Sequence, residues 1–360
     1  MSLQIALTHV YAWPEVRRGG ERYLHELASA LADSGHDVRV LTTAPVASRG
    51  TVLGVEVTYL RRRRMAARRF EQYADEVAFG LQALAHLSAA RLDVWHAFGT
   101  ADASAAALLG RVRSVRSVYT DLGIPGRQSR GRRPDRRFHR FVVDHADHYL
   151  CLSASAGQVL ADDFGRVPGV VGGGVDLRRF APADRRHPTP VLLFTGSLDT
   201  PRKNLGLLLE AVALLRDRGV PVALWLSGPG DPRATLEAAP ASARAAVELQ
   251  GLGEPERLGD LYGRAWATVL PSIHEAFGLV LVESLACGTP VVALDEGGPS
   301  EIVQPGIGYR AQANVEGLAD ACAQALDLAA QPGTASACRA YSERYDWRTA
   351  IVPALEAVYR

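Results

Sequence analysis

This sequence of 360 residues has few cysteines, no long apolar run and almost no lysine. The four cysteines (Cys151, Cys287, Cys322 and Cys338) are widely scattered without CxxC spacing, which excludes a zinc ribbon and argues against a disulfide scaffold. No segment approaches the ~18 consecutive apolar residues of a membrane span. The start, MSLQIALTHVYAW, lacks the regions of a signal peptide. We therefore expect a reduced, cytoplasmic protein.

Charge is balanced, with 40 basic and 39 acidic residues and a net charge of +1, so no global field favours nucleic acid. Lys203 is the only lysine, and the other 39 basic residues are arginine. Hydrophobic residues make up 48% and charged residues 22%, which is typical of a globular protein with large cores. The length fits two domains of middling size.

Short apolar runs alternate with amphipathic stretches, which predicts a mostly parallel α/β architecture. In the first half we expect strands at 3–10, 37–41, 55–60, 93–96, 114–119 and 147–152, with helices that include 21–32, 66–90 and 135–145. The segments 172–174 and 180–190 lack the hydrophobic periodicity of a helix or strand and are interpreted as a linker.

The alternation then restarts, with expected strands at 191–195, 222–227, 245–250, 267–270 and 290–293. Helices are expected at 204–217, 255–264, 279–286 and 314–329, and the final stretch 335–360 is also helical. Two α/β units joined by a short linker predict a cleft between them, where small molecules commonly bind.

Several familiar motifs are missing, among them GxGxxG, the P-loop, HExxH and GxSxG. The segment FHRFVVDHADHYL brings His139, His145 and His148 near one another in sequence, which suggests a metal site. His139 would face another side of a helix than the other two, so we favour histidines at a helix end without a metal.

Glu275 and Glu283 are separated by seven residues in PSIHEAFGLVLVESLACGTPVVA. A helix that begins at Gly278 would leave the amides of Gly278, Leu279 and Val280 unpaired, and these attract an anion such as a diphosphate. Glu275 could then accept hydrogen bonds from sugar hydroxyls, and Glu283, about two turns on, from a ribose diol. The alternative is a capped helix with one solvated glutamate.

This segment, with the upstream TGSLDTPRKNLGLLLEA and the segments 17–42 and 172–182, resembles the retaining GT-B glycosyltransferases of family GT4 (glycosyl transferases group 1). The resemblance implies two Rossmann-like domains facing across a cleft. Residues 1–178 would bind the acceptor, residues 179–340 the nucleotide sugar, and a helix at 341–360 would pack back on the first domain. It also implies a hexosyltransferase (EC 2.4) that takes a UDP- or GDP-linked sugar with retention and needs neither metal nor cofactor.

The resemblance assigns roles residue by residue. Lys203 falls on the family's diphosphate-binding lysine, where an ammonium stabilises the leaving group. Gly19 and Gly20 match a turn that approaches the donor, and Leu252 matches the segment that contacts the nucleobase. The implied catalytic residues are Glu275, Lys203 and Asp121. The implied donor-binding residues are Gly19, Gly20, Ser197, Arg202, Lys203, Leu252, Glu275, Gly278, Leu279, Val280 and Glu283.

Two positions depart from the family pattern. Ser197 stands where the family usually has an arginine. Arg202, otherwise expected to point elsewhere, or a mobile arginine could take the place of that missing arginine. Thr120 stands where a histidine is common, so we take Thr120 and His96 as acceptor-side candidates and expect Asp121 to bind a sugar or acceptor hydroxyl. In a front-face retaining mechanism the departing phosphate oxygen can itself accept the proton, so the reaction does not require that histidine.

The acceptor is left open by the sequence: a small molecule, an oligosaccharide or a lipid-linked molecule. The arginine-rich segments from Arg61 to Arg69 and from Arg127 to Arg140 suggest peripheral contact with the inner face of a membrane, although solvated loops explain them slightly better. The main alternative function is a degenerate subunit that binds nucleotide sugar or a partner without transfer. A nonhydrolysing epimerase fits less well, and nucleic-acid binding is not expected.

Overall fold

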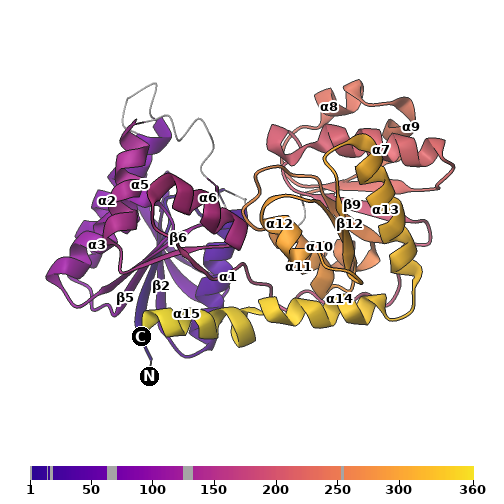
Figure 1. The fold of residues 1–360 in the computed structure, drawn as a ribbon. Coiled ribbons are helices and arrows are strands. Elements are labelled where there is room, and N and C mark those ends of the chain that lie inside the picture. The colour runs from indigo at the N-terminus through magenta and orange to yellow at the C-terminus, as the bar shows by residue number, and fades with distance from the viewer. Residues whose placement is uncertain (1, 14, 17–18, 63–70, 125–132, 253–254) are drawn as a thin grey trace. The chain divides into compact units, whose positions relative to one another are not determined.

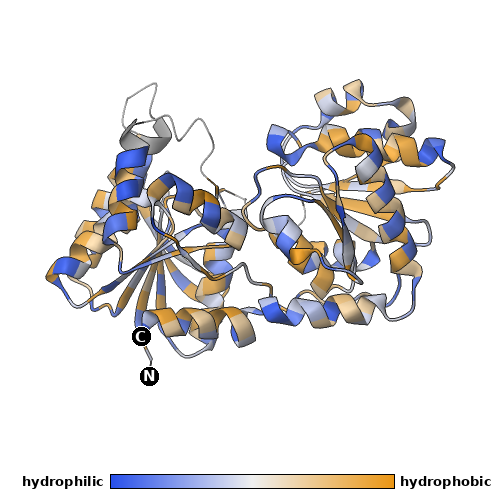
Figure 2. Cartoon of the chain, in the orientation of Figure 1, coloured by the Kyte–Doolittle hydropathy of each residue, from blue (hydrophilic) through white to orange (hydrophobic). Residues whose placement is uncertain are grey.

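The computed structural model describes the chain except residues 1, 14, 17–18, 63–70, 125–132 and 253–254 (Figure 1). The chain forms two compact units. The first comprises Met1–Gly174 together with Trp347–Arg360, and the second is Val175–Asp346. In each unit the hydrophobic residues concentrate on the strands and on the helix faces that cover them (Figure 2).

The first unit is built on one sheet with the strand order β3-β4-β2-β1-β5-β6-β7-β8. Its pairs are parallel apart from the antiparallel pair β3–β4. The strands are β1 (Gln4–Thr8), β2 (Asp37–Ala44), β3 (Ser48–Val52), β4 (Val55–Arg61), β5 (Val94–Ala97), β6 (Arg116–Asp121), β7 (His148–Cys151) and β8 (Gly169–Val170). The described helices that precede the linker are α1 (Gly19–Asp33), α2 (Glu71–Leu87), α3 (Thr100–Val112), α5 (Arg133–His145) and α6 (Ala154–Phe164).

The end of the chain completes the first unit. A π-helical turn, η3 (Trp347–Ile351), leads into α15 (Val352–Tyr359), which Figure 1 shows beside the N-terminus. The indole N–H of Trp347 donates to Oε2 of Glu26 on α1 at 3.1 Å, and Nε2 of His36 lies 3.0 Å from Oε1 of Glu356. These two polar contacts, together with the buried Trp347 indole, fix η3 and α15 to the first unit.

The second unit has a parallel sheet with the order β11-β10-β9-β12-β13-β14. Its strands are β9 (Val191–Thr195), β10 (Ala223–Ser227), β11 (Val247–Gly251), β12 (Ala267–Leu270), β13 (Val291–Leu294) and β14 (Gly308–Ala311). Its helices are η1 (Pro201–Lys203), α7 (Leu205–Asp217), α8 (Arg233–Ala238), α9 (Ala241–Arg244), α10 (Pro255–Arg264), α11 (Leu279–Ala286), α12 (Gly297–Ile302), α13 (Val315–Ala330), α14 (Thr334–Ser342) and η2 (Glu343–Tyr345).

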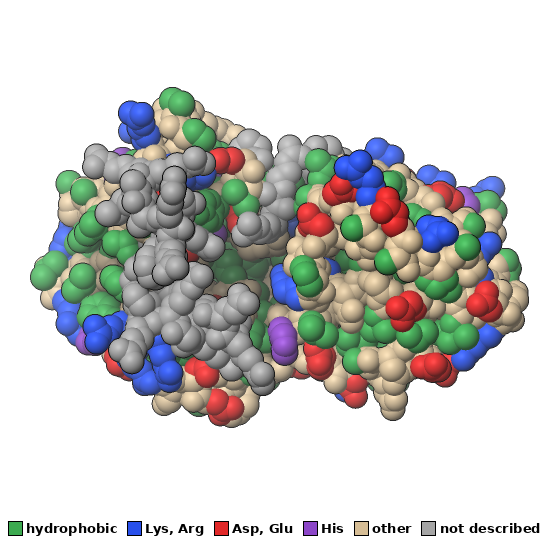
Figure 3. Space-filling model, turned by 90° about the horizontal axis from the view of Figure 1, so that it is seen from above, with side chains coloured by type: hydrophobic (Ala, Val, Ile, Leu, Met, Phe, Trp, Pro, Cys, Tyr) green, Lys and Arg blue, Asp and Glu red, His purple; other side chains and the backbone are tan. Residues whose placement is uncertain are grey.

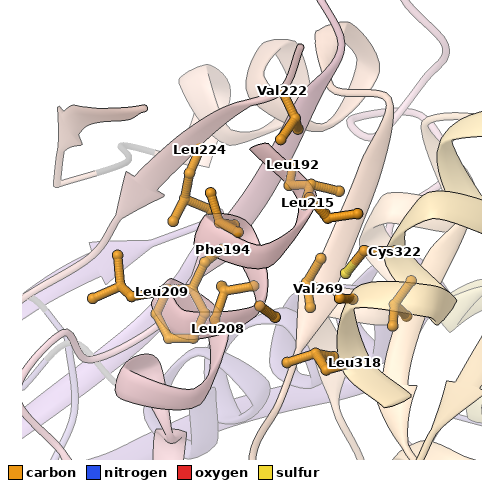
Figure 4. Packing of buried hydrophobic residues seen from close by; sticks show 14 of the residues in the cluster. Leu192, Phe194, Leu208, Leu209, Leu215, Val222, Leu224, Val269, Leu318 and Cys322 are labelled. Carbon is orange, nitrogen blue, oxygen red and sulfur yellow. The ribbon is translucent and has the colours of Figure 1, made fainter. Parts of the chain in front are cut away.

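The core of the second unit lies between the sheet and the helices α7 and α13. Phe194 of β9 and Val269 of β12 are fully buried there with Leu208, Leu318 and Cys322 (Figure 4). Burial of one such aliphatic or aromatic side chain contributes roughly 1.5–3 kcal/mol. The same burial raises the pKa of the Cys322 thiol to about 12, so this cysteine is a packing residue without thiolate character.

Both sheets reverse their strand order at one point, between β1 and β5 in the first unit and between β9 and β12 in the second. Open α/β sheets bind ligands outside the carboxyl ends of the strands at such a reversal. The segments that follow β1, β5, β9 and β12 are therefore the places to look for a site.

The α/β class and the alternation agree with the sequence predictions, with three strands added. β3, β8 and β14 were not predicted, because β3 and β8 are exposed and the central residues of β14 are only partly buried or exposed, so none of them is an apolar run. The turn predicted at Gly19 and Gly20 is wrong: α1 already begins at Gly19, so both glycines lie in its first turn. A Cβ at Gly20 would meet Cδ1 of Leu122 at 3.3 Å.

Candidate active site

The loop after β12 leads into a helix whose N-terminus is uncapped by any side chain. Helix α11 begins at Leu279, next to the predicted start, and Gly278 before it has a left-handed φ of 101°. The amide of Leu281 donates to the Gly278 carbonyl at 2.9 Å. The earlier amides, those of Gly278, Leu279 and Val280, have no intrahelical acceptor, so this end of the helix can bind an anion.

Two cations meet one carboxylate just before that helix. Nζ of Lys203 lies 2.6 Å and Nη1 of Arg202 lies 2.9 Å from the same Oε2 of Glu275. The prediction that Arg202 points elsewhere is therefore wrong. The Ile273 amide donates to the Arg202 carbonyl at 2.9 Å, which ties η1 to the loop that carries Glu275.

The charges of this cluster do not cancel. Burial alone would raise the pKa of Glu275, but the nearby Lys203 ammonium and Arg202 guanidinium hold that pKa below its ordinary value. The carboxylate is thus ionised at neutral pH, and two cations against one anion leave one positive charge. Lys203 is mostly buried, with 15% of its side chain exposed, whereas Arg202 is 48% exposed and can reach a ligand.

Glu283 lies on α11 and is almost enclosed, with 1% exposure. Its Oε2 accepts a hydrogen bond from the hydroxyl of Tyr262 at 2.8 Å, and that hydroxyl lies 2.9 Å from Oγ1 of Thr195. The chain of three side chains holds the Glu283 carboxylate in one orientation.

Ser197 has a local structural partner. Its hydroxyl donates to Oδ1 of Asp199 at 2.8 Å and accepts from the Thr200 hydroxyl at 2.6 Å, so it organises the turn after β9. Nearby, a Cβ at Gly228 would lie 1.9 Å from the Gly196 carbonyl oxygen, so only glycine permits this approach of the chain after β9 to the chain after β10. Leu252, which follows β11, is half exposed, at 50%.

The sequence reasoning missed a glycine pair at the start of α12. A Cβ at Gly298 would lie 2.1 Å from the Ala276 carbonyl oxygen, and the Gly298 amide donates to the Glu275 carbonyl at 3.1 Å. His274 beside it has a φ of 53°, a strained value for a residue with a side chain. The signal was the Gly-Gly pair separated by two residues from the end of a buried strand, which marks a close approach of two backbone segments.

In the first unit, the acceptor-side candidates His96 and Thr120 bond to each other. Nε2 of His96 lies 2.7 Å from Oγ1 of Thr120, and Nδ1 lies 2.7 Å from the Tyr359 hydroxyl. All of the His96 side chain is buried, which lowers its pKa to about 3 and keeps the ring neutral. An acceptor could contact His96 only by displacing one of these two partners.

Asp121 ends β6 at the carboxyl edge of the same sheet. Its Oδ1 accepts from the Gly123 amide at 3.2 Å, and its Oδ2 lies 3.1 Å from Nε2 of His139. His145, by contrast, places Nδ1 2.7 Å from the Phe141 carbonyl oxygen of its own helix. Within the described part of the chain, no three His, Cys, Asp or Glu side chains gather in a way that could hold a metal ion.

The two arginine-rich segments are described only in part, since 63–70 and 125–132 lie outside the described residues. Among the described arginines, Arg62 forms a paired contact with Glu15 at 2.8 Å, and Arg140 donates to the Phe164 carbonyl. On the face shown in Figure 3, acidic and basic side chains of the second unit are interspersed. No described helix is both long enough and apolar enough to cross a membrane.

Comparison with known proteins identifies the family of the chain. Residues 189–327 match the family model of the glycosyl transferases group 1, and residues 17–179 match that of Glycosyltransferase Family 4. The glycogen synthase of Mycobacterium tuberculosis is 30% identical over 97% of this chain and 92% of that protein. The chain belongs to the family 4 glycosyltransferases. A second relative is the D-inositol 3-phosphate glycosyltransferase of Geodermatophilus obscurus. It is 37% identical to this glycosyltransferase over 46% of this chain and 42% of the relative's chain.

Solved structures show that this family 4 glycosyltransferase has the GT-B fold. The sucrose-phosphate synthase of Thermosynechococcus elongatus matches with a TM-score of 0.85 at 21% identity, over 99% of this chain and 98% of that one. The lipopolysaccharide glycosyltransferase WaaG matches with a TM-score of 0.75 at 18% identity, over 98% and 99%. Anabaena HepE in complex with UDP-glucose also has a TM-score of 0.75 at 18% identity, over 99% of each chain.

Proposed function

We propose that this glycosyltransferase moves a hexosyl group from a UDP- or GDP-linked donor to an acceptor hydroxyl with retention of the anomeric configuration. The observation that carries the proposal is the convergence of Lys203 and Arg202 on Glu275, three residues before the uncapped N-terminus of α11. Cations and unpaired helix amides together suit a diphosphate. HepE, which has the same fold, is described in complex with UDP-glucose.

In this proposal the second unit holds the donor. The diphosphate binds the amides of Gly278, Leu279 and Val280, and the ammonium of Lys203 neutralises charge that develops on the leaving phosphate. Arg202 adds the second positive charge, because its guanidinium is exposed and can reach the diphosphate. Preorganised charges of this kind typically contribute about 2.7–4 kcal/mol to transition-state stabilisation. The two cations thus do the work of a metal ion, and no metal or cofactor is required.

The two glutamates bind sugar hydroxyls. Glu275 exchanges part of its contact with the cations for hydroxyls of the transferred sugar, and Glu283, held by Tyr262, accepts hydrogen bonds from the ribose. The further donor-binding residues in this proposal are Gly19, Gly20, Ser197 and Leu252. Gly19 and Gly20 contribute as first-turn amides of α1, and Leu252 as an exposed contact to the base.

The first unit binds the acceptor, and Asp121 accepts a hydrogen bond from its hydroxyl. The acceptor oxygen attacks C1 of the donor sugar on the face that the diphosphate leaves, and the bond from C1 to the phosphate oxygen breaks. The proton of the hydroxyl passes to that departing oxygen, so atoms and charge balance without a protein base. His96 and Thr120 support the strand that carries Asp121 (β6), through their mutual contact at 2.7 Å.

The acceptor class proposed here is a polyhydroxylated molecule: a small molecule, an oligosaccharide or a lipid-linked sugar. Relatives named for glycogen synthesis and for D-inositol 3-phosphate support the first two forms. A cytoplasmic location, with membrane contact through the arginine-rich segments if the acceptor is lipid-linked, belongs to the same proposal.

A transfer assay in EDTA tests the proposal. UDP-glucose, GDP-mannose and ADP-glucose are each offered with maltoheptaose, myo-inositol or D-inositol 3-phosphate, and the anomeric proton of the first product is read by NMR. We expect an α-linked product from an α-linked donor. A β-linked first product would overturn retention. Donor binding without transfer to any acceptor would favour the degenerate subunit, which Ser197 and Thr120 motivate.

A further inference from the structure

The carboxylate of Asp121 is held from two sides, by backbone and by a histidine of another element. Besides the Gly123 amide on Oδ1, the imidazole of His139 on α5 places Nε2 3.1 Å from Oδ2. Both side chains are about nine-tenths buried, with 11% of Asp121 and 10% of His139 exposed. Asp121 is the last residue of β6, at the sheet edge where α/β proteins bind ligands.

The ring of His139 is fixed by aromatic neighbours from three further elements. It stacks on Phe164 of α6, with 4.0 Å between ring centroids and 28° between planes. It also meets Tyr119 of β6 edge to face at 5.8 Å and Tyr149 of β7 at 6.4 Å. A ring so enclosed cannot rotate freely, so Nε2 stays beside Oδ2 of Asp121.

We infer that His139 is a positioning residue for Asp121 in the acceptor half of the reaction; this rests on the proposed function. The Gly123 amide takes one acceptor site on Oδ1, whereas Oδ2 is buried against Nε2 of His139 in an ion-pair contact that is not a hydrogen bond. A further lone pair of Oδ1 can receive an acceptor hydroxyl. The imidazole thereby fixes the side-chain rotamer of Asp121, and with it the orientation of an acceptor hydroxyl that binds to this carboxylate. The acceptor class is any molecule with a hydroxyl to orient.

Two substitutions and a matched control separate this role from packing. His139→Phe keeps a flat ring between Phe164 and the tyrosines but removes the nitrogen beside Oδ2 of Asp121, whereas His139→Gln keeps a polar nitrogen in the side chain. The control is His145→Phe on the same helix, since His145 also stacks on a phenylalanine, Phe141, at 4.3 Å, and its Nδ1 lies 2.7 Å from a carbonyl oxygen of its own helix.

The readouts are kcat and KM for the acceptor, KM for the donor, hydrolysis of the donor sugar nucleotide without acceptor, and the melting temperature. We expect His139→Phe to lower kcat/KM for the acceptor about 10- to 100-fold, because misoriented groups lose rate on that scale. Donor KM, hydrolysis and melting temperature should stay near the wild type. His139→Gln should recover much of the loss, and His145→Phe should resemble the wild type.

Wild-type acceptor kinetics in His139→Phe would overturn the inference. So would equal losses in transfer and in donor hydrolysis, or a large fall in melting temperature, because these indicate a structural role. If the wild type transfers to none of maltoheptaose, myo-inositol or D-inositol 3-phosphate, the proposed function fails first and the inference with it. Failure of the proposed function and failure of the inference are distinguishable, because the first is seen in the wild-type protein and the second only in the His139 variants.

Discussion

Replacing Lys203 by methionine should weaken nucleoside diphosphate binding without unfolding the second unit. The substitution keeps most of the aliphatic stem and removes the only lysine charge of the chain. In the structure the ammonium lies 2.6 Å from Oε2 of Glu275, and the two side chains are 15% and 17% exposed. An ammonium in such a site gives a diphosphate oxygen a charge-assisted hydrogen bond of about 1.5–3 kcal/mol. Its loss therefore raises Kd about 10- to 150-fold.

The protein itself should stay folded, because Arg202 still contacts Glu275 at 2.9 Å. With one cation left against burial, the pKa of Glu275 should rise from its present lowered value. Calorimetric titration with UDP, GDP and ADP in EDTA measures the effect on Kd. The control is Arg218→Met, which removes a cation that is 43% exposed and pairs with Asp320 at 2.6 Å, outside the site. A Kd for Lys203→Met within threefold of the wild type would refute the reasoning.

Three further outcomes follow from the same geometry. Arg202→Gln should raise the Kd for the bound nucleotide by about three- to tenfold. This is a smaller effect than that of Lys203→Met, because solvent screens an exposed charge. A calorimetric Kd raised more by Arg202→Gln than by Lys203→Met would contradict this ranking. Gly228→Ala should cost at least ~2 kcal/mol in urea denaturation, since its Cβ would overlap the Gly196 carbonyl at a left-handed φ of 146°; an unchanged midpoint would contradict this. Burial lowers the pKa of His25 to about 4 and of His96 to about 3, so the folded state binds fewer protons than the unfolded one. The two histidines should therefore lower stability below pH 6.5 by up to about 1.4 kcal/mol per pH unit each, while Asp102, whose pKa burial raises to about 7, offsets one of them. A flat denaturation midpoint between pH 6.5 and 5 would contradict this.

The fold could be predicted to a large extent because parallel strands buried on both faces are continuous apolar runs. The strand Val191–Thr195 and the helix Leu279–Ala286 have the predicted bounds. What escaped prediction has little hydrophobic signal: β3, with the sequence SRGTV, is almost wholly exposed, and α3 is rich in alanine, which has no marked periodicity.

The site was predicted in its residues but less well in its contacts. The spacing of Glu275 and Glu283 and the single lysine were visible in the sequence. The ion pair of Arg202 with Glu275 was not visible in the sequence. It depends on the turn η1 and on the backbone hydrogen bond from the Ile273 amide to the Arg202 carbonyl, which joins residues 71 positions apart. The contact of His139 with Asp121 likewise joins a helix to a strand end, and no local pattern encodes such a pair.

The most direct test of the account is the thermal stability of the wild-type protein with UDP, GDP, ADP and dTDP and their common sugar conjugates, in EDTA. A ligand at about 100 times its Kd should stabilise the protein by roughly 2.7 kcal/mol, a shift of a few degrees for a chain of this size. The account predicts that one nucleotide class raises the melting temperature and that Lys203→Met abolishes most of the rise. No rise with any of these nucleotides, or an equal rise in Lys203→Met, would contradict the donor site described here.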